Sequence, residues 1–138
     1  MLKTELGRLY AERALSGCRN SSIVVPDIAY LVGLSESIVL QTIDELCYVN
    51  EINGKQDCII DSDWWVYLTY ADVLENLPFF KTSYKVKSLI TRLTKSGFLL
   101  VKDNPTKSKA KWYRVNHVKL TCALLNLHND ADVQLIEF

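Results

Sequence analysis

Long apolar runs are missing from this chain of 138 residues. No stretch approaches the roughly 20 apolar residues that cross a membrane as a helix, so we expect no membrane association. The N-terminus also lacks the charged patch, apolar stretch and cleavage site of a secretory signal, and we expect none. The hydrophobic fraction of 49% still suffices for a packed core, which excludes a disordered tail or a coiled coil.

Residues that hold metals or perform catalysis are few. The two histidines, His117 and His128, stand late in the chain beside no nucleophile motif, and there is no Walker loop or paired-carboxylate motif. The four cysteines are scattered, without a CxxC pair or a histidine at ligand spacing; they are Cys18, Cys47, Cys58 and Cys122. We therefore expect no enzyme activity, no metal site and no cofactor, and reduced cysteines in a cytoplasmic protein.

Net charge is absent too, because 16 Lys and Arg residues balance 16 Asp and Glu residues. This balance argues against a generic binder of polyanions. The two halves nevertheless differ: residues 1–65 contain five basic and ten acidic residues, whereas residues 81–119 contain eleven basic residues and one acid, Asp103. Such a split indicates a nucleic-acid surface on one side of the molecule. The alternative is a solvated helix face beside an exposed hairpin.

Residues 64–116 carry one continuous pattern of expected elements. In order they are a strand at 64–67, a helix at 69–77, a turn at 78–80, a helix at 82–96, and strands at 98–102 and 111–116. A lysine-rich polar loop joins the last two strands. Helix, turn, helix and basic hairpin is the layout that places one helix in a DNA major groove and a wing on the adjacent backbone.

We therefore expect a mainly helical α+β fold, a winged helix-turn-helix with an N-terminal helical extension. Three regions follow from this interpretation. Residues 1–63 form a helical segment that packs on the domain or dimerises it, 64–120 the DNA-binding core, and 121–138 a C-terminal helix or the start of a following region.

The N-terminal region is expected to contain a helix over residues 2–15, a break at 17–22 and a helix from Pro26 to Val32. A further helix is expected to run to about Tyr48, with Ser35 as its cap. Residues 27–46 thus resemble a second helix-turn-helix. The side chains that it is expected to offer to solvent would repel phosphate, so we interpret it as a packing or dimerisation platform; they are Glu36, Gln41, Asp44 and Glu45.

Two further segments complete the expected secondary structure. The turn signal Asn53-Gly54 predicts that residues 49–52 and 58–60 pair as a hairpin. Near the C-terminus a helix is expected over 118–127, interrupted by the polar residues 129–132. The apolar residues 133–138 look like the start of another element, which suggests a longer protein.

The helix at 82–96 has a stripe that alternates between three- and four-residue spacing and is expected to be buried; it consists of Val86, Leu89, Ile90 and Leu93. Thr82 is expected to cap the helix. Lys85 stands where a carboxylate normally favours the helix dipole, which makes sense if the helix meets a phosphate or a base edge. Base or groove contacts are assigned to Ser83, Tyr84, Lys85 and Ser88, and phosphate contacts to Lys81, Lys87 and Arg92. The alternative for Tyr84 is a core or dimer contact.

In the expected wing, residues 103–106 turn the chain, and Lys107, Lys109 and Lys111 follow at alternate positions. A persisting strand register would place the three lysines on one face, where they could follow a phosphate backbone. Further along the strand, Trp112 and Val115 are expected to alternate with Tyr113 and Arg114. The alternative is a flexible, soluble hairpin tip.

Aromatic residues are concentrated in the same region; they are Trp64, Trp65, Tyr67, Tyr70, Phe79, Phe80, Trp112 and Tyr113. We expect them to close the core between helices and wing. A stacking platform for single-stranded nucleic acid is the alternative.

Several of these residues recur in order in a known family. They are Ile38-Val39-Leu40-Gln41-Thr42-Ile43, Trp65-Val66-Tyr67, Tyr70 with Leu74, Leu77-Pro78-Phe79-Phe80, Gly97-Phe98-Leu99 and Lys111-Trp112-Tyr113-Arg114-Val115-Asn116. Over roughly residues 27–120 the chain resembles the winged-helix DNA-binding domains of replication initiators and replisome organisers from phages, plasmids and satellite elements. It departs from that pattern by an extra residue, Lys81, and by Leu93-Thr94 in place of Leu-Glu.

The resemblance implies binding to double-stranded DNA at an origin or operator. No segment after Leu120 looks like a helicase, primase or nuclease, so we expect any such activity to belong to a missing part of the protein or to a partner. Replication proteins are an expected partner, through a region outside this chain. Two alternatives remain: a repressor of a phage or plasmid, and a winged-helix adaptor that binds protein. A homodimer is expected, because one short helix and one wing give little specificity without paired half-sites.

Overall fold

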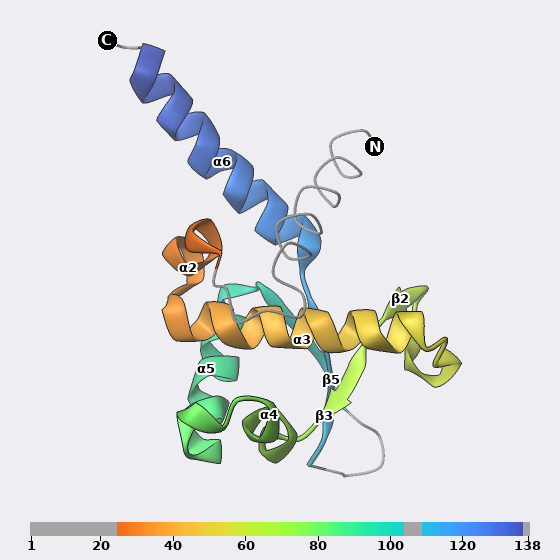
Figure 1. Ribbon diagram of the computed structural model, residues 1–138. Helices are drawn as coiled ribbons and strands as arrows, with labels where there is room; N and C mark the ends of the chain where they lie inside the picture. The colour runs from red at the N-terminus through yellow and green to blue at the C-terminus, as the bar shows by residue number, and fades with distance from the viewer. Residues whose placement is uncertain (1–24, 104–108, 137–138) are drawn as a thin grey trace.

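The structure consists mainly of helices, and short antiparallel strands pack against them (Figure 1). The computed structural model describes the backbone of residues 25–103 and 109–136, and the side chains up to residue 127. The helix expected at 2–15 lies outside the described residues. The elements are α2 (Pro26–Val32), α3 (Leu34–Ile52), η1 (Gln56–Cys58), β1 (Ile59–Ile60), β2 (Asp63–Trp64), β3 (Val66–Leu68), α4 (Tyr70–Asn76), η2 (Pro78–Phe80), α5 (Ser83–Ser96), β4 (Leu99–Lys102), β5 (Lys111–Val115) and α6 (His117–Ile136).

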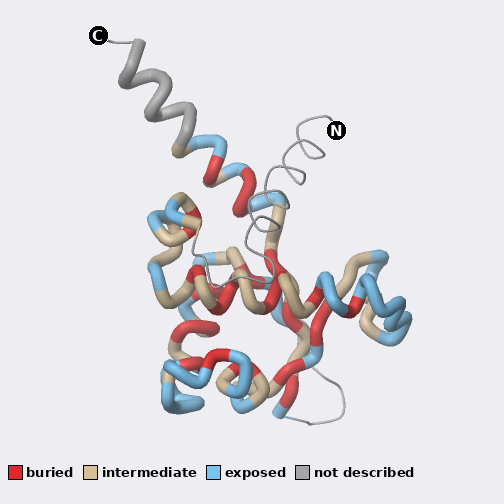
Figure 2. Tube along the Cα trace, in the orientation of Figure 1, coloured by how far each residue is buried: buried red, intermediate tan, exposed pale blue. Residues whose placement is uncertain are grey.

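The expected class, α+β and mainly helical, is confirmed. Strands β3, β5 and β4 form one antiparallel sheet in that order, while β1 and β2 form a separate small hairpin. In the larger sheet Val66 faces Tyr113, and Leu99 faces Val115. Since side chains alternate along a strand, these apolar residues share the inner face of the sheet. That face packs against α3 and α5. Figure 2 shows buried residues along the strands and along α3.

Local sequence rules explain the two helices at the centre of the pattern. Thr69 and Asp72 form a reciprocal capping box at the start of α4. Thr82 caps α5 as expected, because its hydroxyl accepts from the backbone N–H of Lys85 at 3.2 Å. Gly97 ends α5 at a φ of 83°, a left-handed conformation that glycine adopts without a Cβ penalty. The expected bounds of both helices are thus correct to within one residue.

The hairpin expected from residues 49–52 and 58–60 is wrong. Helix α3 continues through Ile52, and Asn53-Gly54 ends this helix instead of joining two strands. The extra helical turn is stabilised by Asn50, whose side chain donates to the carbonyl of Trp65 at 3.0 Å. The apolar pair at 59–60 instead joins residues 63–64 in the β1–β2 hairpin.

Two expectations about the start and the exposed face of α3 are also wrong. The helix begins at Leu34 after Gly33, and Ser35 makes no capping hydrogen bond. Asp44 is buried instead of exposed, because its carboxylate lies 2.8 Å from Nε2 of His117 at the start of α6. This contact joins residues 73 positions apart, so the sequence pattern of the helix alone could not reveal it.

The face pattern of β5 and the length of α6 need correction as well. Tyr113 and Val115 point inward, whereas Trp112 is on the opposite face and packs on Tyr67 with ring centroids 4.9 Å apart. Strand alternation requires this grouping. The polar residues 129–132 do not interrupt α6, which runs to Ile136 and leads away from the body in Figure 1. Each of these residues costs a helix at most about 0.7 kcal/mol, which is too little to end it.

Candidate nucleic-acid interface

Helix α5 divides into a buried stripe and a cationic outer face. The stripe expected from the sequence is confirmed, since Val86, Leu89, Ile90 and Leu93 are all buried. They pack α5 against α3 and α4. Because this apolar stripe faces inward, the polar residues of α5 lie on its outer side. Of the expected DNA-contacting residues at this site, Ser88 is half-buried and the others are exposed; these are Lys81, Thr82, Ser83, Tyr84, Lys85, Lys87 and Arg92.

The lysines near the start of α5 differ from the other cations in their ion pairing. Within the described part of the chain, no carboxylate lies within ion-pair distance of Lys81, Lys85 or Lys87. No acidic residue occurs in α5 itself. Their charges are thus uncompensated by side chains of the described structure. Lys85 and Lys87 are two residues apart in the helix, so they lie on the two flanks of its exposed surface. Exposed cations without a carboxylate partner attract phosphate.

Carboxylates do compensate other cations of the basic segment. Arg92 lies 3.8 Å from Glu36, a residue of the acidic N-terminal half. In the hairpin, Lys111 lies 3.6 Å from the neighbouring Asp103, and both groups are partly exposed. An exposed pair such as Lys111–Asp103 contributes about 0–1 kcal/mol, so a phosphate can displace its carboxylate. The Glu36 side chain is only 14% exposed, whereas Arg92 is 66% exposed. Arg92 and Lys111 can therefore contact a phosphate only by leaving these carboxylates.

Two further basic residues of the sheet form ion pairs with carboxylates of the β1–β2 hairpin. Lys102 donates to Asp61 at 2.6 Å, and Arg114 lies 3.3 Å from Asp63. Arg114 also donates to the carbonyl of Trp64 at 2.9 Å and is mostly buried. Because carboxylates of the N-terminal half pair with Lys102 and Arg114, fewer basic residues are free to contact a phosphate than the eleven of segment 81–119 suggest.

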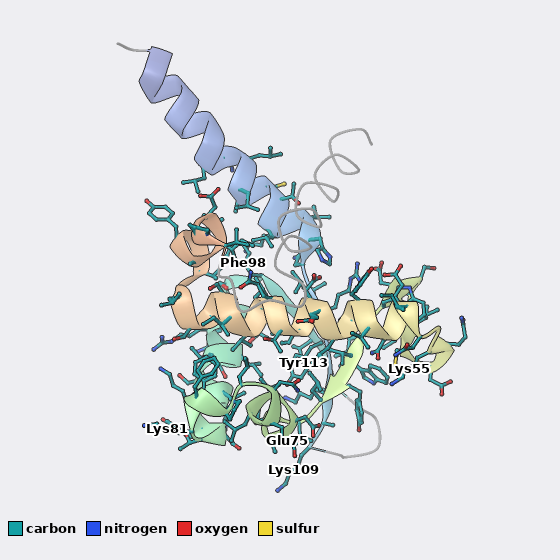
Figure 3. All side chains as sticks on the ribbon, viewed as in Figure 1. Lys55, Glu75, Lys81, Phe98, Lys109 and Tyr113 are labelled. Carbon is teal, nitrogen blue, oxygen red and sulfur yellow. The ribbon has the colours of Figure 1, made fainter. Side chains whose placement is uncertain are left out.

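The expected wing is only partly described. Lys107 lies outside the described residues, while Lys109 is exposed. Strand β5 begins at Lys111, so the alternation expected to align Lys109 with Lys111 does not extend to Lys109. Figure 3 shows Lys81, Glu75 of α4 and Lys109 in the lower part of the molecule. Acidic and basic side chains thus both occur in this part of the surface.

The turn before α5 has an unusual backbone. Lys81 has a φ of 70° and a ψ of −37°, and the N–H of Thr82 donates to the carbonyl of Phe80 at 2.8 Å. A hydrogen bond across three residues with positive φ at the centre describes the rarer and more strained form of γ-turn. Lys81, the extra residue relative to the family pattern, therefore occupies a strained backbone position.

Phe79 is an exposed residue at this surface that the sequence analysis missed. Its side chain is 58% exposed, although the aromatic cluster was expected to lie in the core. Tyr84 is 81% exposed, so it makes no core contact within this chain. Because η2 is a 3₁₀ turn with three residues per turn, the adjacent Phe79 and Phe80 cannot both point inward. Phe80 packs against the core, which leaves Phe79 exposed, and the sequence alone does not show which of the two is buried.

Two ionisable side chains with shifted pKa values, Cys47 and Tyr113, lie in the core. Burial raises the pKa of the Cys47 thiol to about 12, and burial also raises the pKa of the Tyr113 hydroxyl. Both groups are therefore neutral at pH 7. Over residues 25–103 and 109–127, no three His, Cys, Asp or Glu side chains are grouped as metal ligands would be. None of the described helices combines the length and apolarity that a membrane span requires.

No protein-family model matches this chain, and neither the curated proteins nor the solved structures include a significant match to it.

Proposed function

We propose that this chain binds double-stranded DNA sequence-specifically as a winged helix, with α5 in the major groove and the β4–β5 hairpin on the adjacent backbone. The order α3, β3, α4, α5, β4, β5, with a sheet ordered β3-β5-β4, supports the winged-helix interpretation. The observation that carries the proposal is the group of unpaired lysines at the exposed start of α5, Lys81, Lys85 and Lys87. The first turns of a recognition helix commonly reach base edges, and nearby cations hold phosphates.

The most specific form of the proposal is the origin-binding part of a replication initiator from a mobile element, which rests on the family resemblance. Replication proteins would then act through a region outside this chain. Operator binding by a repressor would use the same surface. A protein-binding adaptor is less well supported, because its equivalent helix would carry both signs of charge, whereas α5 carries only positive charge. The proposal includes a cytoplasmic location and requires no cofactor.

A selection experiment tests the proposal. Duplexes bound by the full chain are enriched from a random pool, and affinities for a selected and an unrelated duplex are measured across salt concentrations. We expect log K to fall linearly with log salt, with a slope of about 0.9 for each phosphate contact. Binding without salt dependence, or no enrichment of any sequence, would contradict the proposal.

Three lysine variants assign the roles within the surface. Lys85→Ala is expected to change the preferred sequence, whereas Lys109→Ala should weaken all duplexes alike and lower the salt slope by about 0.9. Lys55→Ala is the matched control, because Lys55 is exposed at the far end of α3, away from α5 (Figure 3). Equal effects of all three substitutions would show that α5 has no special role.

Glu75 offers a test of opposite sign. Glu75 lies in the same lower part of the molecule as Lys81 and Lys109 (Figure 3), so Glu75→Gln should strengthen DNA binding, since it removes repulsion of phosphate. Glu51→Gln removes the same charge near the distant end of α3 and should change affinity less. A larger effect of Glu51→Gln would place the DNA on another face.

We further propose that the chain binds DNA as a homodimer, with the N-terminal region, residues 1–63, as the interface. Leu34, at the start of α3 and at the opposite end from Glu51 and Lys55, is 61% exposed and is a candidate contact in the described part of that region. Sedimentation should show a dimer that Leu34→Lys dissociates. Moving the two half-sites apart by five base pairs, half a helical turn, should reduce affinity for the dimer. A monomer that binds single half-sites with full affinity would refute this part.

A further inference from the structure

Two aromatic rings stand exposed at the start of the cationic helix. Phe79 in η2 is 58% exposed, and Tyr84 in the first turn of α5 is 81% exposed. Single exposed apolar residues are common, but these two lie on elements that contact each other, since η2 packs against α5. The residues around them in the sequence are basic, because Lys81 lies between the two positions and Lys85 follows them.

Rigid local structure holds both rings in place. Phe79 packs on Phe80 with centroids 4.7 Å apart, and Phe80 in turn packs against the core. The γ-turn at Lys81 fixes η2 relative to α5, and the Thr82 cap fixes the first turn that carries Tyr84. The two rings are therefore presented outward by ordered backbone. Such preorganised apolar groups lose little conformational entropy when they bind.

The chemistry of the surface points to one kind of DNA contact. Lysines attract any phosphate, so they cannot by themselves select a sequence. The Phe79 ring has no hydrogen-bonding group, so it can distinguish bases only through apolar contact. In the major groove the apolar group that base edges present is the C5-methyl of thymine.

We infer that Phe79 and Tyr84 contact thymine methyl groups in the major groove, and so select thymine at one or two positions of the bound site. This inference rests on the proposed function, in which α5 enters that groove. Lys81 and Lys85 provide the charge complementarity, because they draw the phosphates flanking those bases towards the rings. Thymine methyls also distinguish DNA from RNA, so the same contact favours DNA.

Deoxyuridine substitution tests the inference directly, because it removes the methyl group without changing base pairing. Each thymine of the selected duplex is replaced in turn, and affinity is measured for the wild type, Phe79→Ala, Tyr84→Ala and Tyr84→Phe. At one or two positions the wild type should lose about four-fold in affinity, the effect of one buried methyl group. Phe79→Ala or Tyr84→Ala should abolish that sensitivity, whereas Tyr84→Phe should retain it.

Val118→Ala is the control, because Val118 is 49% exposed on α6, outside both α5 and the proposed dimer interface. It should leave the deoxyuridine sensitivity unchanged. Circular dichroism verifies that the variants fold, which we expect because the truncated side chains are exposed. All of these measurements use the full chain.

The outcomes separate this inference from the proposed function. If the wild type binds duplexes with a steep salt dependence but no deoxyuridine weakens binding, the inference is wrong and the proposed function stands. The inference is also wrong if the sensitivity persists in both alanine variants, or if those variants change only the oligomeric state. If the wild type binds no duplex, the proposed function itself is wrong.

Discussion

Replacing Lys81 by glycine should stabilise the folded chain while weakening its binding to DNA. Lys81 has a φ of 70° at the centre of a γ-turn, where a Cβ is strained. Relief of such strain is worth about 1–3 kcal/mol. Glycine's greater freedom in the unfolded chain offsets about 0.5–1 kcal/mol of this. A net gain of about 1 kcal/mol corresponds to a rise in Tm of about 4 °C for a domain of this size.

Lys81→Ala is the matched control, because alanine removes the same charge but keeps the Cβ that causes the strain. Its free energy of unfolding should remain within about 0.5 kcal/mol of the wild type, as for most surface substitutions. Both variants should lower the slope of log K against log salt by about 0.9, since each loses one phosphate contact. The stability measurement is thermal unfolding without DNA, and the binding measurement is the salt titration.

Two results would refute this reasoning. A glycine variant no more stable than the alanine variant would show that position 81 is not strained. A salt slope unchanged in both variants would show that the Lys81 ammonium does not contact phosphate.

Three further substitutions test the core and the helix ends. The raised pKa of Cys47, from its ordinary value of 9.0 to about 12, means that its thiol ionises only in the unfolded chain between these pH values. Stability is therefore unaffected below pH 9 and falls towards pH 12, by up to about 1.4 kcal/mol per pH unit, and Cys47→Ala should remove that part of the slope in urea unfolding. His117→Leu should lower the free energy of unfolding by about 1–3 kcal/mol, because the buried Asp44 carboxylate loses a partner. Gly97→Ala should cost about 1–2 kcal/mol in thermal unfolding, because Gly97 has a φ of 83°.

Each of these has an outcome that would contradict it. An alkaline slope identical in Cys47→Ala and wild type would exclude the thiol as a contributor. His117→Leu should be compared with His117→Gln, whose side-chain amide can donate to Asp44; equal losses would mean that the hydrogen bond contributes little. For Gly97, Gly54→Ala provides a second positive-φ glycine with open space around its Cα. A much larger loss at Gly97 would point to a clash with Lys119.

The lysines of the candidate surface were predictable from the sequence, whereas their availability was not. The buried stripe of α5 follows from three- and four-residue spacing, so the positions of Lys85 and Lys87 outside that stripe follow as well. The pairing of Lys102 with Asp61 was not predictable, since it joins residues 41 positions apart. Which positive charges remain free thus depends on contacts between distant segments.

Helices α4 and α5 and their ends were predictable from the sequence, because caps, turn glycines and apolar spacing act over a few residues. The extension of α3 to Ile52, the burial of Asp44 and the exposure of Phe79 depend on contacts that form in the folded chain. The two groups of features differ in the range of the interactions that produce them. Backbone hydrogen bonds and caps are local, whereas the burial of a side chain depends on what packs against it from elsewhere in the chain.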